Sequence, residues 1–140
     1  MTHSSFRARV SLWVVTPIEL DVFCNQLADQ LRLPSFNFDA ENVYEWGLTK
    51  IEQGWVEINI SRKHNPGDPD FEEPFHILFL VENTAPAKYD NSWVVDNLVR
   101  IYGQAIANLT SKPAYYGDIK YVGSEAYTYR PATTFTPDMN

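Results

Sequence analysis

The pattern of hydrophobic and polar positions changes from strand-like to helix-like soon after the start of the chain. Residues 6–15 are rich in apolar and β-branched side chains, which predicts a strand that becomes buried toward its end. Thr16, Pro17 and Glu19 then fit the N-cap, the first helical position and the last residue of a capping box. The helix that they begin should end before Pro34. Its apolar residues recur at helical spacing and form one predicted buried face: Leu20, Phe23, Cys24, Leu27 and Leu31.

The middle of the chain predicts three further strands. Residues from about 42 to 51 form a β-rich region, and Gly54 in the turn that follows can adopt a positive φ. Residues 55–63 alternate between apolar and polar side chains, which is typical of a strand with one buried face and one face open to water or to a partner. Residues 75–81 are almost continuously apolar and predict a central strand, which follows a loop over 64–74 rich in Pro and Asp.

A second helix and a last strand are predicted in the C-terminal part. Asn91 or Ser92 caps this helix, and residues 115–122 form the last predicted strand. Residues 124–140 are polar and contain prolines, so we expect an extended or mobile tail after a single domain over residues 1–123. The helix has a predicted apolar face at helical spacing: Val95, Leu98, Tyr102, Ala105 and Leu109.

These elements predict an α+β fold in the order βαβββαβ. Two helices can cover one face of a mostly antiparallel five-stranded sheet. The order resembles a ferredoxin-like split βαβ unit with one additional strand. Because such folds carry many unrelated functions, the fold class alone does not indicate what the protein does.

Composition and charge narrow the kinds of partner. The chain has 140 residues and is 44% hydrophobic, which is enough for one domain with its own core. Its net charge of −7 disfavours nucleic acid and anionic membranes and favours a basic partner. Cys24 is the only cysteine, so no internal disulfide forms, and no apolar run reaches the length of a signal sequence or membrane span. We therefore expect a cytosolic protein.

No arrangement of residues predicts catalysis, so we expect a binding protein rather than an enzyme. Cys24 lies on the predicted buried face of the first helix, where a thiol is inert. His3 is close to the N-terminus and His76 lies inside an apolar strand, which leaves His64 as the most accessible histidine. The motifs of nucleotide-binding loops and serine hydrolases are absent, and no His or Cys spacing suits a metal.

Two groups of residues are predicted to bind a partner. The loop over 64–74, after the third predicted strand, carries clustered acids that do not match a calcium-binding loop, so they form either a solvated loop or a partner-facing patch. Tyr44 and Trp46 share one face of a predicted strand with Leu48, and exposed rings beside acids are good interface anchors. The other possibility is that these rings pack beneath the C-terminal tail. The predicted partner-binding acids are Asp68, Asp70, Glu72 and Glu73.

The chain resembles the immunity proteins of bacterial toxin systems, including those of contact-dependent inhibition, in its size, acidic charge and element order. The resemblance implies a cytosolic protein that binds and neutralises a cognate toxin domain and needs no nucleic acid, membrane, metal or cofactor. Many toxins that cut nucleic acids are basic because they bind phosphates. An acidic protein would be steered to such a surface and would cover it.

A small enzyme or ligand-binding domain is the alternative function. It would use a cleft between helix and sheet near His64, Asp68 and Asp70, since a histidine with nearby acids can perform general acid–base chemistry. A convergent pocket lined by these side chains would favour this alternative, and a flat acidic surface would favour the binding protein. A third possibility is a module that associates with itself through its aromatic face.

Overall fold

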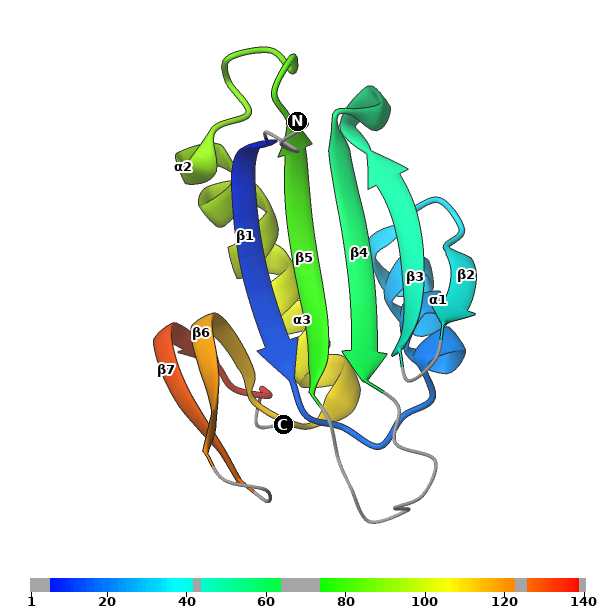
Figure 1. Ribbon diagram of the computed structural model, residues 1–140, viewed down its shortest axis with the longest axis vertical. Helices are drawn as coiled ribbons and strands as arrows, with labels where there is room; N and C mark the ends of the chain where they lie inside the picture. The colour runs from blue at the N-terminus through cyan, green and yellow to red at the C-terminus, as the bar shows by residue number, and fades with distance from the viewer. Residues whose placement is uncertain (1–5, 42–43, 64–73, 123–125, 139–140) are drawn as a thin grey trace.

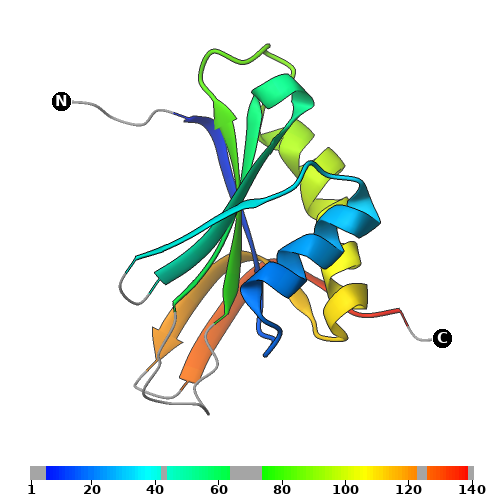
Figure 2. The same ribbon diagram turned by 90° about the vertical axis from the view of Figure 1, so that its right-hand side faces the viewer.

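The computed structural model describes residues 6–41, 44–63, 74–122 and 126–138. Within these ranges, seven strands form one sheet in the order β2-β3-β4-β5-β1-β6-β7, and every neighbouring pair is antiparallel. The helices pack on one face of this sheet, and the other face is free of helices (Figures 1 and 2). The elements are β1 Phe6–Val14, α1 Leu20–Leu31, β2 Asn37–Glu41, β3 Tyr44–Ile51, η1 Glu52–Gly54, β4 Val56–Lys63, β5 Phe75–Glu82, α2 Asn91–Val94, η2 Val95–Val99, α3 Arg100–Thr110, β6 Ala114–Val122 and β7 Ala126–Phe135.

The predicted five-stranded sheet in the order βαβββαβ, a ferredoxin-like variant, is wrong. The α+β class and the placement of both helices on one face hold, but β2 and β7 are additional strands. Every residue of β2 is exposed, so the short alternation of polar and apolar side chains over Asn37–Glu41 does not mark a buried face. The seventh strand lies within the segment predicted as a polar tail, residues 124–140, and contains Pro131, which is compatible with a sheet edge but not with a central strand. Both additions are edge strands.

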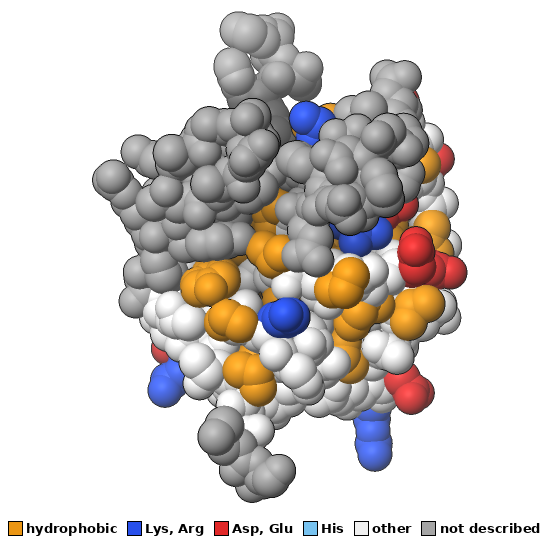
Figure 3. Space-filling model, turned by 90° about the horizontal axis from the view of Figure 1, so that it is seen from below, with side chains coloured by type: hydrophobic (Ala, Val, Ile, Leu, Met, Phe, Trp, Pro, Cys, Tyr) orange, Lys and Arg blue, Asp and Glu red, His pale blue; other side chains and the backbone are white. Residues whose placement is uncertain are grey.

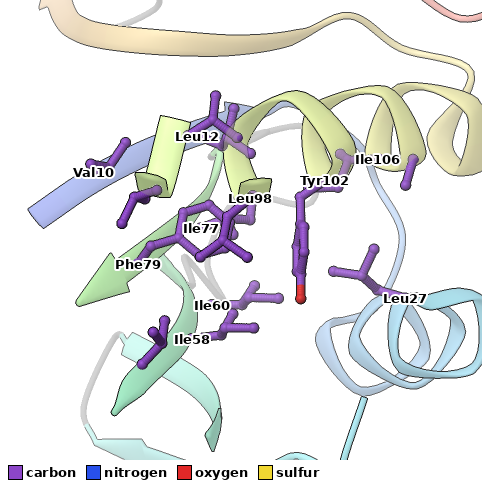
Figure 4. Packing of buried hydrophobic residues seen from close by; sticks show 14 of the residues in the cluster. Val10, Leu12, Leu27, Ile58, Ile60, Ile77, Phe79, Leu98, Tyr102 and Ile106 are labelled. Atoms are coloured by element: carbon purple, nitrogen blue, oxygen red, sulfur yellow. The ribbon is translucent and has the colours of Figure 1, made fainter. Parts of the chain in front are cut away.

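The core lies between the helices and one face of the central strands. The alternating residues Val56, Ile58 and Ile60 of β4 are fully buried, as the sequence predicted. Figure 4 shows Phe79 of β5 and Tyr102 of α3 pointing toward each other, and their rings meet edge-on with centroids 5.1 Å apart. Burial of each large apolar side chain contributes about 1.5–3 kcal/mol, so this layer provides the main stabilisation of the fold.

The first helix begins later than predicted. It starts at Leu20, and no side chain caps it, whereas Thr16 is buried rather than acting as the N-cap. The reason is a tertiary contact: Arg62 Nη1 donates a hydrogen bond to the carbonyl of Ile18 at 3.0 Å and holds this part of the chain before the helix. The predicted buried face of the helix is confirmed for Leu20, Phe23, Cys24 and Leu27.

The second helical stretch, formed by α2, η2 and α3, contains a π-helical turn. Asp90 caps it, one residue before the predicted cap, because its Oδ1 accepts a hydrogen bond from the Trp93 amide at 2.9 Å. The π-helical turn, η2, adds a residue to the turn and rotates the apolar face. Val94, just before this turn, is fully buried, whereas Val95, predicted to lie on the apolar face, is only partly buried.

The end of β7 and the residues after it pack against α3. Phe135 lies over Gly103, where a Cβ atom would come within 2.4 Å of the ring. Asn108 exchanges two hydrogen bonds with Asp138, at 2.8 and 3.0 Å, and Gln104 donates to the carbonyl of Thr136 at 2.8 Å. These contacts tie the last described residues to the helical layer.

We predict that Gly103→Ala destabilises the protein. In most helix interiors this substitution stabilises by up to about 1 kcal/mol. Here the added methyl group must displace the Phe135 ring, so we expect a net loss of about 1–2 kcal/mol in the free energy of unfolding, measured with urea. In a Phe135→Ala background, the same substitution should become neutral or stabilising. An equal loss in both backgrounds would contradict the packing described.

Candidate partner-binding surface

The structure describes some of the residues predicted to bind a partner. Tyr44 and Trp46 lie on the sheet face opposite the helices, because the alternate residues of the same strand, Gly47 and Thr49, pair with the buried Ile60 and Ile58. Tyr44 is 53% exposed, and Trp46 is partly buried. The other predicted residues, together with His64, lie outside the described ranges: Asp68, Asp70, Glu72 and Glu73.

The edge of the sheet formed by β2 carries a group of acidic side chains. It lies beside the beginning of α1 and encloses a hollow of about 310 Å³. Figure 3 shows acidic side chains on the side of the molecule where α1 and β2 lie. The hollow is lined by the apolar Leu20, Phe38 and Ala40 and by the acidic Glu19, Asp21, Asp39 and Glu45.

Exposed apolar side chains occur on the same elements as these acids. In the described part of the chain, four large hydrophobic residues are exposed, and three of them belong to the elements that bound this edge: Val22, Phe38 and Tyr44. Glu41 is the cross-strand partner of Tyr44 on β2, and Lys63 is its partner on β4. We use "acidic edge" for the surface that ends at Tyr44 and consists of Glu19, Asp21, Val22, Phe38, Asp39, Glu41 and Tyr44.

Gly47 allows Phe38 to lie over the sheet. A Cβ atom at Gly47 would come within 2.9 Å of the Phe38 ring and 3.2 Å of Cys24 Sγ. The ring of Phe38 also stacks on that of Phe36, with centroids 6.5 Å apart, and stays 42% exposed. A glycine inside a strand is typical of such a close approach, so Gly47 is the feature of the sequence that indicates it.

Arg62 neutralises only the innermost acid of the hollow. Its Nη2 lies 2.9 Å from Glu45 Oε1, and the two side chains are 13% and 24% exposed. This is the only ion pair among the described residues. No described cation is therefore paired with Glu19, Asp39 or Glu41, and the acidic edge keeps its negative charge.

Cys24 offers no reactive thiol. Its side chain is fully buried. Burial, followed by the nearby charges of Asp21 and Glu45, raises the pKa of the thiol to about 12. Since the thiolate is the nucleophile and the metal ligand, the group is inert at neutral pH.

His76 belongs to a structural network on the helix-free face of the sheet. Its ring stacks on Trp13 with centroids 3.9 Å apart, and its Nε2 lies 2.7 Å from Ser11 Oγ. Burial, followed by the charge of Arg9, lowers the pKa of His76 to about 4. Trp13 Nε1 in turn donates to the carbonyl of Gly117 at 2.8 Å, at the irregularity in the pairing of β6 with β7. A histidine with so low a pKa is a weak base, so the Ser11–His76 contact is better suited to fixing the sheet than to proton transfer.

A second hollow, of about 620 Å³, lies between the end of α1, η1 and the second helical stretch. Its lining mixes apolar residues such as Leu98 and Ile101 with polar and basic ones such as Lys50. The one acid in this lining, Glu52, already accepts a hydrogen bond from the Tyr89 hydroxyl at 3.0 Å. Burial, with the charge of Glu52, raises the pKa of Tyr102, so this phenol stays protonated. The described ranges contain no group of three or more His, Cys, Asp or Glu residues that could hold a metal ion.

The chain matches no protein-family model, no curated protein and no solved structure. Function is therefore inferred from the surface itself. No helix among the described residues has both the length and the apolar character needed to cross a membrane.

We predict that His76 makes stability depend on pH between about 6.5 and 4. The pKa of this group is lowered in the folded state, so the unfolded state takes up the proton first. The contribution of the neutral ring is complete above pH 6.5 and is lost as the pH falls toward 4, to a total of up to about 3 kcal/mol.

Urea unfolding of the wild type and of His76→Gln at several pH values tests this prediction. The other histidines and the carboxylates titrate in both proteins, so the difference isolates His76. The variant should lose less free energy of unfolding between pH 6.5 and 4 than the wild type does. Parallel curves would show that His76 does not titrate differently in the folded state.

We also predict that Cys24 reacts with a thiol reagent only when the protein unfolds. At pH 8 the labelling of the folded protein should be slower than that of the urea-unfolded protein on the order of a thousandfold, because the thiol is buried and protonated. The chain has one cysteine, so the labelling signal has a single source. Rapid labelling of the folded protein would mean that the thiol is accessible and ionised.

Proposed function

We propose that this chain is an immunity-type protein that binds and neutralises a basic, nucleic-acid-cleaving toxin domain in the cytosol. The observation that carries the proposal is the acidic edge, where unpaired carboxylates surround exposed apolar side chains. Its acids are Glu19, Asp21, Asp39 and Glu41, and its apolar residues are Val22, Phe38 and Tyr44.

The composition of this surface suits a protein partner. Stable interfaces combine a few apolar or aromatic anchors with a polar rim, and the anchors supply most of the affinity. Phe38 and Tyr44 are exposed by 42% and 53%, and both lie on the outermost two strands. The surrounding carboxylates would steer a basic surface toward these rings and raise the rate of association.

The same charge suits a partner that itself binds nucleic acid. A domain that cuts nucleic acid holds phosphates with Lys and Arg side chains. Carboxylates on the acidic edge would occupy those side chains in place of phosphate and so block the substrate. The acids at positions 68, 70, 72 and 73 come soon after Lys63 in the sequence, and Lys63 pairs with Tyr44. These acids would add to the negative charge that faces the partner.

The described residues favour binding over catalysis. Cys24 and His76 are the two described side chains whose types are most often reactive. Cys24 is buried in the core, and His76 stacks on Trp13. A protein that neutralises a toxin by covering its active surface needs no reacting group of its own.

We predict that reversing the charge of the acidic edge slows association with the toxin domain at least about tenfold at low salt. The test variant is Glu19→Lys, Asp39→Lys and Glu41→Lys. The control variant reverses three exposed acids elsewhere, Asp29, Glu82 and Asp96, so that both variants have the same net charge. The first step is to search the neighbouring genes for a large secreted protein, and the probe is the C-terminal domain of the protein found in this way. Association is followed by stopped-flow at several salt concentrations.

Thermal melts and growth assays complete the test. Exposed charges contribute little to stability, so both variants should melt close to the wild type. Cells that express the toxin domain should survive with the wild type or the control variant and die with the edge variant. Equal association rates for the two variants would exclude the acidic edge as the binding surface. Absence of any complex between the chain and the toxin domain would contradict the proposed function.

A further inference from the structure

The two edges of the sheet differ in how well they can accept another strand. At one edge, β7 contains Pro131, which lacks an amide hydrogen, and its pairing with β6 shifts register between Tyr116 and Gly117. At the other edge, β2 pairs with β3 in continuous register from Asn37 to Glu41 and contains no proline. An uninterrupted edge presents a row of backbone donors and acceptors, which is a template for pairing.

One amide of β2 shows which groups point outward. The amide of Ala40 donates a hydrogen bond to Asp39 Oδ1 at 2.8 Å, so it is directed away from the β3 ladder. In an antiparallel ladder, alternate residues direct their backbone groups to the same side. Phe38 and Ala40 therefore present their backbone to the outer edge, and the Asp39 carboxylate covers only the Ala40 amide.

The side chains of β2 define what an added strand would meet. Asp39 and Glu41 point to the helix-free face, since they pair with Trp46 and Tyr44, and Phe38 points to the opposite face beside the hollow. Side chains of a strand alternate between the two faces. An incoming strand would thus meet carboxylates on one face and the ring of Phe38, with Leu20 behind it, on the other.

We propose that β2 accepts an extended basic segment of the partner as an additional antiparallel strand. Its Lys or Arg side chains lie beside Asp39 and Glu41, and its alternate apolar side chains cover Phe38. The Asp39 carboxylate releases the Ala40 amide to the new ladder and pairs with a cation of the incoming strand. This inference rests on the proposed function, because it states how the basic partner is held.

A second copy of the chain is a poorer occupant of this edge. Two-fold antiparallel pairing centred on Asp39 sets Asp39 against itself, and pairing centred on Ala40 sets Asp39 against Glu41. Pairing centred on Phe38 avoids these clashes, but it sets Asp39 against Asn37 and gives neither acid a basic partner. Like charges directly opposite each other destabilise a strand pair. The same acids that hinder self-pairing attract a basic strand, and this charge complementarity decides the occupant.

Synthetic peptides test the inference without the toxin domain. The probe is a fluorescent peptide of about ten residues that alternates Lys and Val, since alternation fits the two faces of a strand. One matched peptide carries N-methyl groups on alternate backbone amides, which removes ladder donors and leaves the charge unchanged. Another replaces Lys with Glu. Binding is measured by fluorescence anisotropy, and amide hydrogen exchange reports the protection of individual residues.

We expect the Lys peptide to bind and to protect the amides of Phe38 and Ala40 from exchange. The N-methylated peptide should bind at least tenfold more weakly, and the Glu peptide should not bind. In the protein, Asp39→Asn with Glu41→Gln should weaken binding at least tenfold, because it removes the charge and keeps the backbone. Ala40→Pro should also weaken binding of the Lys peptide, because it removes one backbone amide from the edge of β2. If the Pro variant does not fold, the N-methylated peptide on the wild-type protein still tests whether backbone hydrogen bonds are needed.

Three results would overturn strand addition. The first is equal binding of the Lys peptide and its N-methylated form with no protection of Phe38 and Ala40, which would indicate charge attraction alone. The second is binding of the toxin domain, sensitive to the edge variant, without binding of any basic peptide. The third is concentration-dependent self-association that Ala40→Pro abolishes, which would make a second copy the occupant. The first two results contradict strand addition but not the proposed function. Failure of the toxin domain to bind contradicts the proposed function, whatever the peptides show.

Discussion

The guanidinium group of Arg62 on β4 makes three different contacts, which link the residues before α1 with the two neighbouring strands, β3 and β5. It donates to the carbonyl of Ile18 at 3.0 Å, pairs with Glu45 at 2.9 Å, and lies 4.4 Å from the centroid of the Phe75 ring. A charge that is only 13% exposed must be paired and hydrogen-bonded in this way, or its burial would cost several kcal/mol. These contacts fix where the chain turns from β1 into α1, and hence where the helix begins relative to the edge of the sheet.

The acidic edge depends on this arrangement. Arg62 compensates the inner carboxylate of Glu45, so the hollow can form without a buried unpaired charge, while the outer carboxylates remain free. Gly47 adds the second condition, since only a residue without a side chain allows the Phe38 ring to lie over β3 and next to Cys24. One buried cation and one missing side chain therefore produce a surface on which apolar rings lie among unpaired acids.

The sequence predicted the elements whose stability comes from burial. The alternation in β4, the apolar run of β5 and the buried face of α1 all reflect side chains that leave water, and these assignments agree with the structure. The edge strand β2 was missed because backbone pairing with β3, and not burial, holds it. The acidic edge could not be predicted either, since Glu19 and Asp39 are brought together by the packing of α1 beside β2.

The position of β1 in the sheet has a consequence for the way in which the chain folds. β1 lies between β5 and β6, and Val14 pairs with Phe75 on one side and with Ala114 on the other. The first described strand thus stays without neighbours until segments made much later in synthesis have arrived. Closing such long loops costs entropy before any strand contact is gained, and folds dominated by distant contacts fold slowly. On the ribosome, the hairpin of β3 and β4 can form early, whereas β1 gains its second neighbour only after β6 has been made.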